Sequence, residues 1–325
     1  MKVKVLIIRF SSIGDIVLTS PAIRCLKQQL DGDVEIHFLT KKAFKSTLIA
    51  NPHLSKIHTI ENKVSEVIDI LKSENFDYVV DLHNNIRSRQ VKKRIDSLAF
   101  TVDKLSWEKW LLTTFKIDKL PKVHIVDRYI ETFAALNINN DNKGLEYFIP
   151  EVDEVDLSAL PANFQNGYIG FVIGGTYATK RLPKEKIISI CRKIETPIVL
   201  LGGPDDQSVA KVISNKLNDK VYNACGKYTL NQSASLVKQA NKIITHDTGL
   251  MHVAAAFKKD IVSIWGNTVT EFGMAPYLST PNSRVVEVYD LRCRPCSKLG
   301  YGKCPKKHFN CMNMIDEIEV VSCVN

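Results

Sequence analysis

The 325-residue chain contains no run of about 20 apolar residues, the length that a membrane-spanning helix needs. It also lacks the succession of basic, apolar and small residues that marks an export signal. The apolar stretch at residues 3–10 is too short for such a signal and ends at Ser11 and Ser12. These absences exclude a helical membrane span and predict a cytoplasmic protein.

The sequence also argues against two other protein classes. No Gly-x-Gly-x-x-Gly loop follows the first apolar run, which disfavours a Rossmann dinucleotide site there. Because an export signal is absent, the eight cysteines indicate thiols rather than a disulfide framework.

The balance of charge is basic, with a formal net charge of +9. Such a surplus favours an anionic partner, which could be nucleic acid, a phosphorylated metabolite or an anionic membrane surface. Charge alone does not choose among these three.

The order of apolar segments predicts an α/β protein of two doubly wound domains, because short apolar runs alternate with amphipathic stretches. The length suits two domains, which we place at residues 1–155 and 156–325, with a polar linker over 137–167. Strands are expected at 3–10, 34–40, 56–60, 77–83, 99–102, 168–175, 197–203, 221–226, 242–247 and 260–266. Helices are expected at 15–30, 43–50, 64–73, 87–95, 123–136, 184–193, 207–217, 231–240 and 250–257.

The first strand runs into a helix through a loop that contains Ser11, Ser12, Gly14 and Asp15. Gly14 permits close approach of the backbone, and a helix N-terminus suits an anion. Asp15 is either a cap that interacts with the helix dipole or a base that takes a proton from an acceptor hydroxyl.

Two loops of the second half carry small and charged residues. Gly174-Gly175-Thr176 ends a strand and Lys180 follows, which suits a diphosphate clamp, although solvated lysines are common. The next strand ends at Gly202-Gly203-Pro204, and then Asp205 or Asp206 either accepts ribose hydroxyls or caps a helix.

The segment KIITHDTGLMH is the most specific one for anion binding. A buried strand leads to Asp247, Thr248 and Gly249, and a small-residue helix begins with His252 in its opening turn. Backbone N–H groups, the threonine hydroxyl and the histidine can all donate to phosphate oxygens.

A cysteine cluster near the C-terminus has the spacing C-x2-C-x7-C-x6-C, formed by Cys293, Cys296, Cys304 and Cys311. Two interpretations are open, a structural Zn²⁺ site or reduced cysteines that pack a C-terminal lobe. Six lysines and arginines between Arg292 and Lys307, with no acid among them, could contact acceptor phosphates or the inner membrane face.

These motifs, SSIGD, GGT with a lysine four residues later, GGPDD and HDTGLMH, resemble the lipopolysaccharide heptosyltransferases of glycosyltransferase family nine. The resemblance spans nearly the whole chain. It implies a GT-B fold, with two Rossmann-like domains that face a central cleft. The first domain would bind the acceptor and the second an ADP-sugar, and transfer would be inverting and metal-independent.

The matched positions imply roles for individual residues. Asp15 would be the catalytic base, and Lys180 would contact the donor phosphates near the reacting centre. The diphosphate would be held by Thr176, Asp247, Thr248, Gly249 and His252, and the ribose by Asp206. The acceptor would be bound in the first domain, at Ser11, Ser12 and Gly14. Arg87 is the first cation after the strand at 77–83, and it either belongs to a solvated helix face or contacts an acidic acceptor. The family often has a tryptophan where Leu182 stands, which leaves the shape of the donor pocket open.

The expected function is therefore transfer of heptose from ADP-heptose to the inner core of lipopolysaccharide, on a Kdo- or heptose-lipid A acceptor. No cofactor is expected for catalysis, and no nucleic acid is expected as a partner. Peripheral contact with the cytoplasmic face of the inner membrane is expected. One alternative is a family-nine-like transferase with another nucleotide sugar or acceptor. The other is a nucleic-acid-binding protein with a zinc-ribbon-like tail. Against this alternative, the sequence lacks the interleaved aromatic residues of a single-strand platform.

Overall fold

The computed structural model describes residues 2–325, which form two compact units. The first unit comprises the residues up to Ser106 together with Val123–Pro150. The second comprises Trp107–Lys122 and Glu151–Asn325. The chain thus divides at 150/151 rather than at 155/156, and residues 107–122 group with the second unit.

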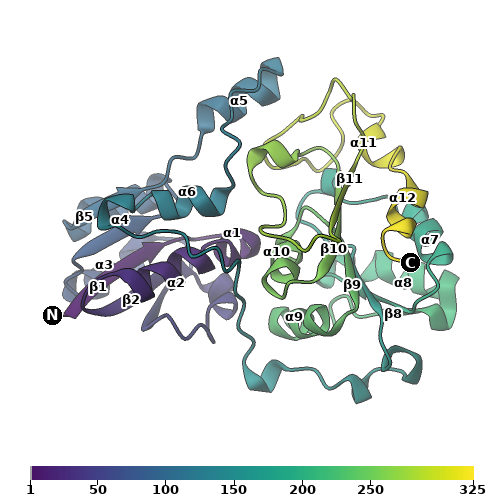
Figure 1. The fold of residues 1–325 in the computed structure, drawn as a ribbon, viewed down its shortest axis with the longest axis horizontal. Coiled ribbons are helices and arrows are strands. Elements are labelled where there is room, and N and C mark those ends of the chain that lie inside the picture. Colours follow the sequence, from purple (N-terminus) through teal and green to yellow (C-terminus); the bar gives the residue numbers. More distant parts are fainter. Residues whose placement is uncertain (1) are drawn as a thin grey trace. The chain divides into compact units, whose positions relative to one another are not determined.

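The first unit is a parallel sheet in the order β3-β2-β1-β4-β5 with helices packed against it (Figure 1). Its strands are β1 (Lys2–Ile8), β2 (Asp33–Lys41), β3 (Lys56–Ile60), β4 (Tyr78–Asp81) and β5 (Leu98–Thr101). The central strand β1 buries Val5, Leu6, Ile7 and Ile8 completely. A continuous apolar run of this kind is what a strand covered on both faces requires.

The helices of this unit are shorter than expected, except α4, which begins one residue earlier. They are α1 (Ile13–Val17), α2 (Ser20–Gln29), α3 (Ile68–Ser73), α4 (Ile86–Ile95) and α6 (Ile125–Glu131). The helix expected over 15–30 breaks at Leu18 and Thr19, and Pro21 then lies in the first turn of α2. The segment expected as a helix over 43–50 is the 3-10 helix η1 (Lys42–Thr47).

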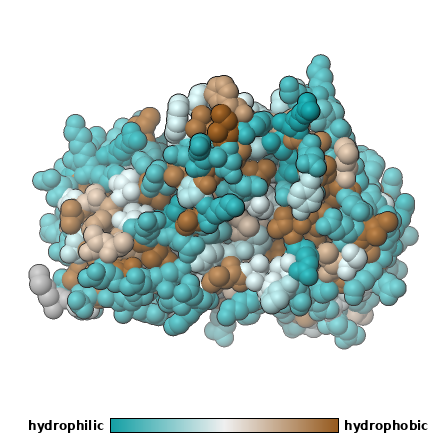
Figure 2. Space-filling model, turned by 45° about the horizontal axis from the view of Figure 1, so that its top comes forward, coloured by the Kyte–Doolittle hydropathy of each residue, from teal (hydrophilic) through white to brown (hydrophobic). Residues whose placement is uncertain are grey.

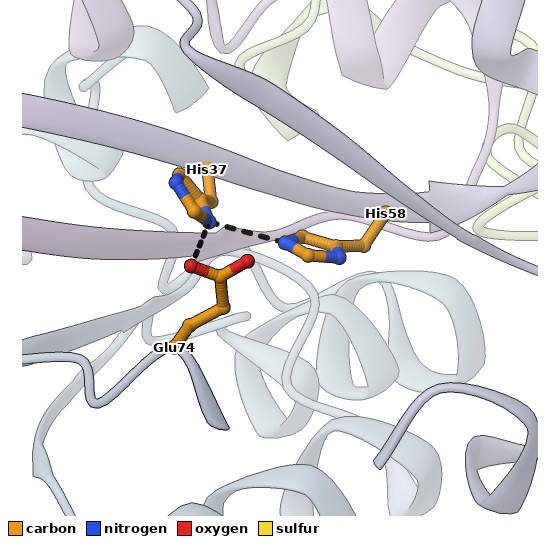
Figure 3. Close-up of side chains that lie close together, drawn as sticks. All are labelled: His37, His58 and Glu74. Carbon is orange, nitrogen blue, oxygen red and sulfur yellow. Dashed lines mark hydrogen bonds and ion pairs between the residues drawn. The ribbon is translucent and has the colours of Figure 1, made fainter. Parts of the chain in front are cut away.

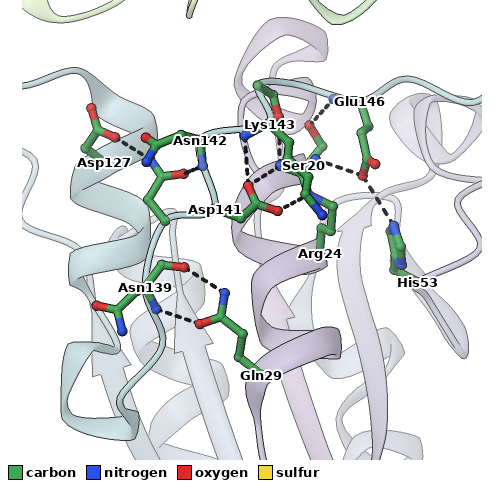
Figure 4. A network of polar contacts seen from close by, with 12 residues as sticks. Ser20, Arg24, Gln29, His53, Asp127, Asn139, Asp141, Asn142, Lys143 and Glu146 are labelled. Carbon is green, nitrogen blue, oxygen red and sulfur yellow. Dashed lines mark hydrogen bonds and ion pairs between the residues drawn. The ribbon is translucent and has the colours of Figure 1, made fainter.

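The first part of the predicted linker lies against α2 (Figure 4). Arg24 pairs with Asp141 through two bonds of 2.7 Å and donates to the Gly144 carbonyl. The backbone N–H of Glu146 donates to the Ser20 hydroxyl. These polar residues anchor the chain to the first unit, so the linker interpretation is wrong for this stretch.

The second unit has a parallel sheet in the order β11-β10-β9-β6-β7-β8. Its strands are β6 (Ile169–Val172), β7 (Ile198–Leu201), β8 (Val221–Asn223), β9 (Lys242–His246), β10 (Asp260–Trp265) and β11 (Arg284–Glu287). Its helices are α5 (Ser106–Phe115), α7 (Lys184–Lys193), α8 (Gln207–Leu217), α9 (Leu230–Gln239), α10 (Gly249–Ala256), α11 (Asn310–Asn313) and α12 (Glu317–Ser322). The sequence patterns indicated neither β11 nor α5, α11 and α12.

Both sheets are parallel and carry helices on their faces, which confirms the predicted α/β class. Within residues 2–325 no helix has both the length and the apolar composition that crossing a bilayer requires.

Candidate active site

Asp15 lies in α1 directly after the carboxyl end of β1, and both of its carboxylate oxygens are engaged. Oδ1 forms a 2.6 Å ion pair with Arg9. Oδ2 accepts from the backbone N–H of Ser12 at 3.0 Å and from the Ser12 hydroxyl at 2.8 Å. The turn around Ser12, Gly14 and Asp15 thus fixes the orientation of the carboxylate at this edge of the sheet.

Arg9 is a residue of this loop that the motif analysis did not select. Its guanidinium donates to the carbonyls of Ser11 at 2.8 Å and Leu82 at 2.6 Å, and lies 5.9 Å from the centre of the Tyr129 ring. Burial disfavours its charge, but Asp15 and Tyr129 outweigh burial and raise the pKa of Arg9. The signal in the sequence is a cation between the strand and the SSIGD motif.

Arg87 borders a basic pocket of about 620 Å³ between η2 (Val64–Glu66) and the start of α4. Lys63 and Arg94 also line this pocket. The Nε of Arg87 donates to the Asn62 carbonyl at 3.1 Å, and Asn85 caps α4 by accepting from the Ser88 N–H. Three cations around one hollow suit an anionic group.

The second unit brings Lys180 and Asp247 together. The Nζ of Lys180 lies 2.5 Å from Asp247 Oδ2, and the Thr268 hydroxyl donates to the same oxygen at 2.9 Å. These residues follow β6, β9 and β10, which are neighbours in the sheet. Ligands of open α/β sheets bind beyond such carboxyl ends of strands.

The glycine loop after β6 approaches the start of α10 closely. A Cβ atom on Gly175 would lie 3.3 Å from the Thr248 methyl group. Thr248 is the N-cap of α10, which begins at Gly249, and His252 is buried inside the helix at 2% exposure. Thr176 follows Gly175 and is exposed. The predicted diphosphate residues therefore gather around one helix N-terminus, with His252 below the surface.

A profile of glycosyltransferase family 9 (heptosyltransferase) matches residues 64–302, well over half of the chain. The chain belongs to glycosyltransferase family 9. This confirms the relationship that the motifs indicated.

Other comparisons agree with this family 9 membership. The chain is 25% identical over 289 residues to lipopolysaccharide heptosyltransferase 1 of Campylobacter coli, which covers 82% of this chain and 84% of that protein. The family 9 glycosyl transferase of Veillonella parvula superimposes with a TM-score of 0.78 at 21% identity, over 98% and 95% of the two chains. The structure of E. coli heptosyltransferase WaaC with ADP superimposes with a TM-score of 0.67 at 21% identity, over 87% of this chain and 92% of that chain.

The structural neighbours confirm the expected GT-B fold class. The family and its curated relatives show that this protein is a glycosyltransferase of the heptosyltransferase-like type.

In this family 9 protein, Asp206 faces inward rather than outward. Its Oδ2 accepts from the Gly203 N–H at 2.9 Å and its Oδ1 pairs with Arg181 at 3.1 Å. A Cβ atom on Gly174 would lie 2.4 Å from Oδ2, so the carboxylate occupies the space that this glycine leaves. Asp205 is exposed. The geometry favours a capping role for Asp206, and its ribose contact stays a prediction.

His246 is a second residue that the motif analysis passed over. Its Nε2 accepts from the Leu182 N–H at 3.1 Å, which ties β9 to the loop that carries Lys180. Burial lowers the pKa of His246 to about 4, so the ring stays neutral and can accept this bond at neutral pH. Leu182 is itself buried, at 5% exposure. The position of His246 at the end of a buried strand is the feature of the sequence that could have indicated it.

The cysteine-rich segment packs against the same region of the second unit. Arg294 donates to the carbonyls of Gly266 and Thr268 and pairs with Glu287. The backbone of Tyr301 exchanges hydrogen bonds with Thr179. These contacts hold residues 292–307 beside the Lys180 loop.

The four clustered cysteines lie near enough to one another that Cys293, Cys296 and Cys304 contribute, after burial, to raising the pKa of Cys311, but no three of their sulfur atoms lie within 4.8 Å of one another. Cys293 lies 3.8 Å from His308 Nε2, and Cys311 is buried in the apolar core, where burial raises its pKa to about 12. Across residues 2–325, the only set of three metal-ligating side chains with ligand atoms within 4.8 Å lies elsewhere. Zinc at the cysteines stays a prediction.

That other set is His37, His58 and Glu74 in the first unit (Figure 3). His37 Nδ1 lies 3.1 Å from His58 Nε2 and 4.0 Å from Glu74 Oε2. Glu74 also pairs with Lys56 at 2.5 Å and Lys4 at 3.1 Å. The hydrogen bond from Lys56 contributes most to lowering the pKa of Glu74 to about 2. Two ammonium groups on one carboxylate oppose a divalent cation, so we interpret the cluster as a partly buried ion-paired network, in which Lys56 is half exposed.

Proposed function

We propose that this family 9 enzyme transfers heptose from ADP-heptose to the inner core of lipopolysaccharide, on a Kdo- or heptose-lipid A acceptor, with inversion at the sugar carbon. The observation that carries the proposal is the group formed by Lys180, Asp247 and Thr268 beside the start of α10. A cation next to a helix N-terminus is suited to a diphosphate. ADP in the WaaC structure and the heptosyltransferase names of the relatives support the choice of donor.

The leaving group would be stabilised by this donor site. As the bond between the sugar and the diphosphate breaks, negative charge grows on the departing phosphate oxygen. Lys180, the N–H groups at the start of α10 and His252 supply positive charge and donors for it. Thr176, Thr248 and Gly249 would contact the same diphosphate. Asp206 would contact the ribose after releasing Gly203 and Arg181.

The acceptor would be activated in the first unit. Asp15 would take the proton of the acceptor hydroxyl as that oxygen attacks the sugar carbon from the face opposite the diphosphate. Arg9 would hold Oδ1 while Oδ2 exchanges its Ser12 donor for the acceptor hydroxyl. Ser11 and Gly14 would border the acceptor, as the family resemblance implies.

The anionic part of the acceptor would bind the basic pocket. Arg87, Lys63 and Arg94 place three cations around a hollow that suits phosphate or carboxylate groups of a lipid A-Kdo type acceptor. We also propose that the protein acts in the cytoplasm with peripheral contact to the inner membrane face, and without a nucleic acid partner.

Metal-independent transfer is supported by where the acidic residues lie. The one Asp-x-Asp sequence is Asp31-Gly32-Asp33, which leads into the amino end of β2. That edge of the sheet is opposite the loop that holds Asp15. Lys180 and the helix terminus would supply the positive charge that a nucleotide-bound Mg²⁺ supplies elsewhere.

Calorimetric titration with ADP and UDP, without added metal, tests the donor assignment. We expect a clear preference for ADP, with affinity reduced at least about tenfold in Lys180→Ala or His252→Ala, because each removes a phosphate donor. Lys216→Ala, on the exposed face of α8, is the matched control and should bind ADP like the wild type.

Preference for UDP would retain a nucleotide site but overturn the ADP-heptose donor in favour of another nucleotide sugar. Absence of binding to either nucleotide would contradict the proposal. Elemental analysis of protein purified without chelator tests the separate zinc prediction, and absence of zinc would contradict it.

A further inference from the structure

We propose that α5 and the basic segment beside it form a docking surface for an anionic phospholipid bilayer. This aromatic-basic surface consists of Trp107, Trp110 and Phe115 on α5 and of the exposed cations Lys303, Lys306 and Lys307. The inference deepens the proposed function, because it names the surface by which an enzyme with a lipid-linked acceptor would reach a membrane.

The three aromatic side chains of this surface are exposed to solvent. Trp107 is 63% exposed, Trp110 39% and Phe115 56%. The two indole rings stack with centroids 4.8 Å apart, and Trp110 meets Phe115 edge-on at 5.2 Å. A contiguous aromatic patch in water indicates an interaction surface.

The exposed rings are not needed to hold α5 in place. Leu112 is buried and packs against Val269 and Phe272 of the same unit. Lys116 donates to the Pro295 carbonyl at 2.6 Å. The helix is therefore anchored by other side chains, and its tryptophans are left to contact a partner.

The anchor of α5 also places it beside the basic segment. Lys116 contacts the carbonyls of Cys293 and Pro295, and Lys306 is close enough to contribute to lowering the pKa of Lys116, which burial lowers most. Most cations between residues 292 and 307 are exposed, whereas Arg294 is buried with Glu287. The segment itself contains no acidic residue.

The chemistry of this surface matches an anionic bilayer. Tryptophan prefers the interface between headgroups and acyl chains, and each lysine near an anionic membrane contributes about 1 kcal/mol of attraction. Leu299 and Tyr301 are also exposed, at 61% and 42%, so the basic segment carries apolar side chains of its own. On the face that Figure 2 draws, hydrophobic side chains (brown) lie among hydrophilic ones (teal).

Nucleic acid fits this surface less well. Single-strand platforms present separate aromatic faces on which bases stack. Here Trp107 and Trp110 stack on each other, which closes one face of each ring. A bilayer needs no free ring face, so the geometry favours lipid.

Flotation with vesicles of neutral phosphatidylcholine, or of phosphatidylcholine with phosphatidylglycerol, tests the proposal on the full chain. We expect binding to the anionic vesicles only, weakened by salt. Binding should fall about tenfold in Trp107→Ser/Trp110→Ser and in Lys303→Gln/Lys307→Gln. Matched controls are Ile318→Ser, at a residue 71% exposed, and Lys211→Gln/Lys216→Gln on α8, which should bind like the wild type.

Tryptophan fluorescence gives an independent reading. The chain has three tryptophans, and Trp265 is fully buried, so vesicle-induced changes report on Trp107 and Trp110. A blue shift with anionic vesicles is expected. Absence of the shift and of flotation, or binding by the tryptophan variant equal to the wild type, would overturn the proposal. Binding to single-stranded RNA that the same variants lose would reassign the surface to nucleic acid.

Binding of ADP separates this proposal from the proposed function. The tryptophan variant should retain wild-type ADP affinity, because Trp107 and Trp110 lie outside the predicted donor contacts. Lys303 and Lys307 line a pocket with Ala178 and Thr179, next to Lys180, so the tryptophan variant is the one used for this comparison. Loss of vesicle binding with normal ADP affinity supports the surface, whereas a wild-type protein that binds vesicles but not ADP contradicts the proposed function alone.

Discussion

At the scale of single residues, Arg9 determines how Asp15 is presented. We expect Arg9→Gln to lower kcat for sugar transfer about a hundredfold, because the carboxylate loses its 2.6 Å ion pair with Arg9. Arg9→Lys keeps a positive charge and should recover part of that loss. Steady-state kinetics with ADP-heptose would show the difference, while ADP affinity stays unchanged. Equal kcat in all three proteins would exclude a positioning role.

The burial of His58 makes the stability of the protein depend on pH. Burial lowers the pKa of His58 to about 4, against about 6.5 in an unfolded chain. Its contribution to the free energy of unfolding is therefore fully present above pH 6.5 and is lost as pH falls toward 4. The loss for this one group is at most about 3 kcal/mol.

Urea unfolding between pH 7 and pH 4.5 measures this effect. His58→Gln should make the decline shallower than in the wild type, whatever its stability at neutral pH. An unchanged slope in His58→Gln would show that the proton uptake lies at other groups.

At the scale of secondary structure, the attachment of residues 137–150 to α2 depends on one buried cation. Arg24 is 3% exposed and pairs with Asp141 and Glu146. Asp141→Ala leaves Arg24 with one carboxylate partner, so we expect a loss of about 2 to 4 kcal/mol in the free energy of unfolding. Glu185→Ala, at a side chain 70% exposed, should change it by less than about 0.5 kcal/mol. Equal urea midpoints for both variants would contradict this role of Arg24.

Most elements of the sheets follow from apolar periodicity alone. The ten expected strands are present, and the clearest signals come from strands such as β6 and β7, whose buried runs are covered on both faces and contain few polar residues. The eleventh strand, Arg284–Glu287, was missed because it is short and lies at the sheet edge, with Arg284 exposed. Helix α5 was missed because Trp107 and Trp110 place apolar side chains on its outer face, which obscures the amphipathic period.

The site was predictable where motifs coincide with strand ends, and less so where tertiary contacts decide. The pairing of Lys180 with Asp247 follows from the adjacency of β6 and β9, which the sequence pattern does not reveal. The inward turn of Asp206 depends on the space that Gly174 leaves. Contacts that depend on strand order or on empty space cannot be read from local spacing.

At the scale of the whole molecule, the net charge of +9 is not spread evenly. Cations surround the pocket beside Arg87 in the first unit and occupy residues 292–307 in the second. An enzyme whose acceptor is an anionic glycolipid needs attraction both to the acceptor headgroup and to the membrane that holds it. The two basic regions are suited to these two tasks.

Sugar transfer from ADP-heptose to a Kdo-lipid A acceptor, measured for the wild type and for Asp15→Asn without added metal, tests the central claim most directly. We expect the wild type to transfer heptose, and Asp15→Asn to lose activity by about a hundredfold to ten-thousandfold while still binding ADP. Transfer by Asp15→Asn at the wild-type rate, or no transfer by a wild-type protein that binds ADP, would contradict the account.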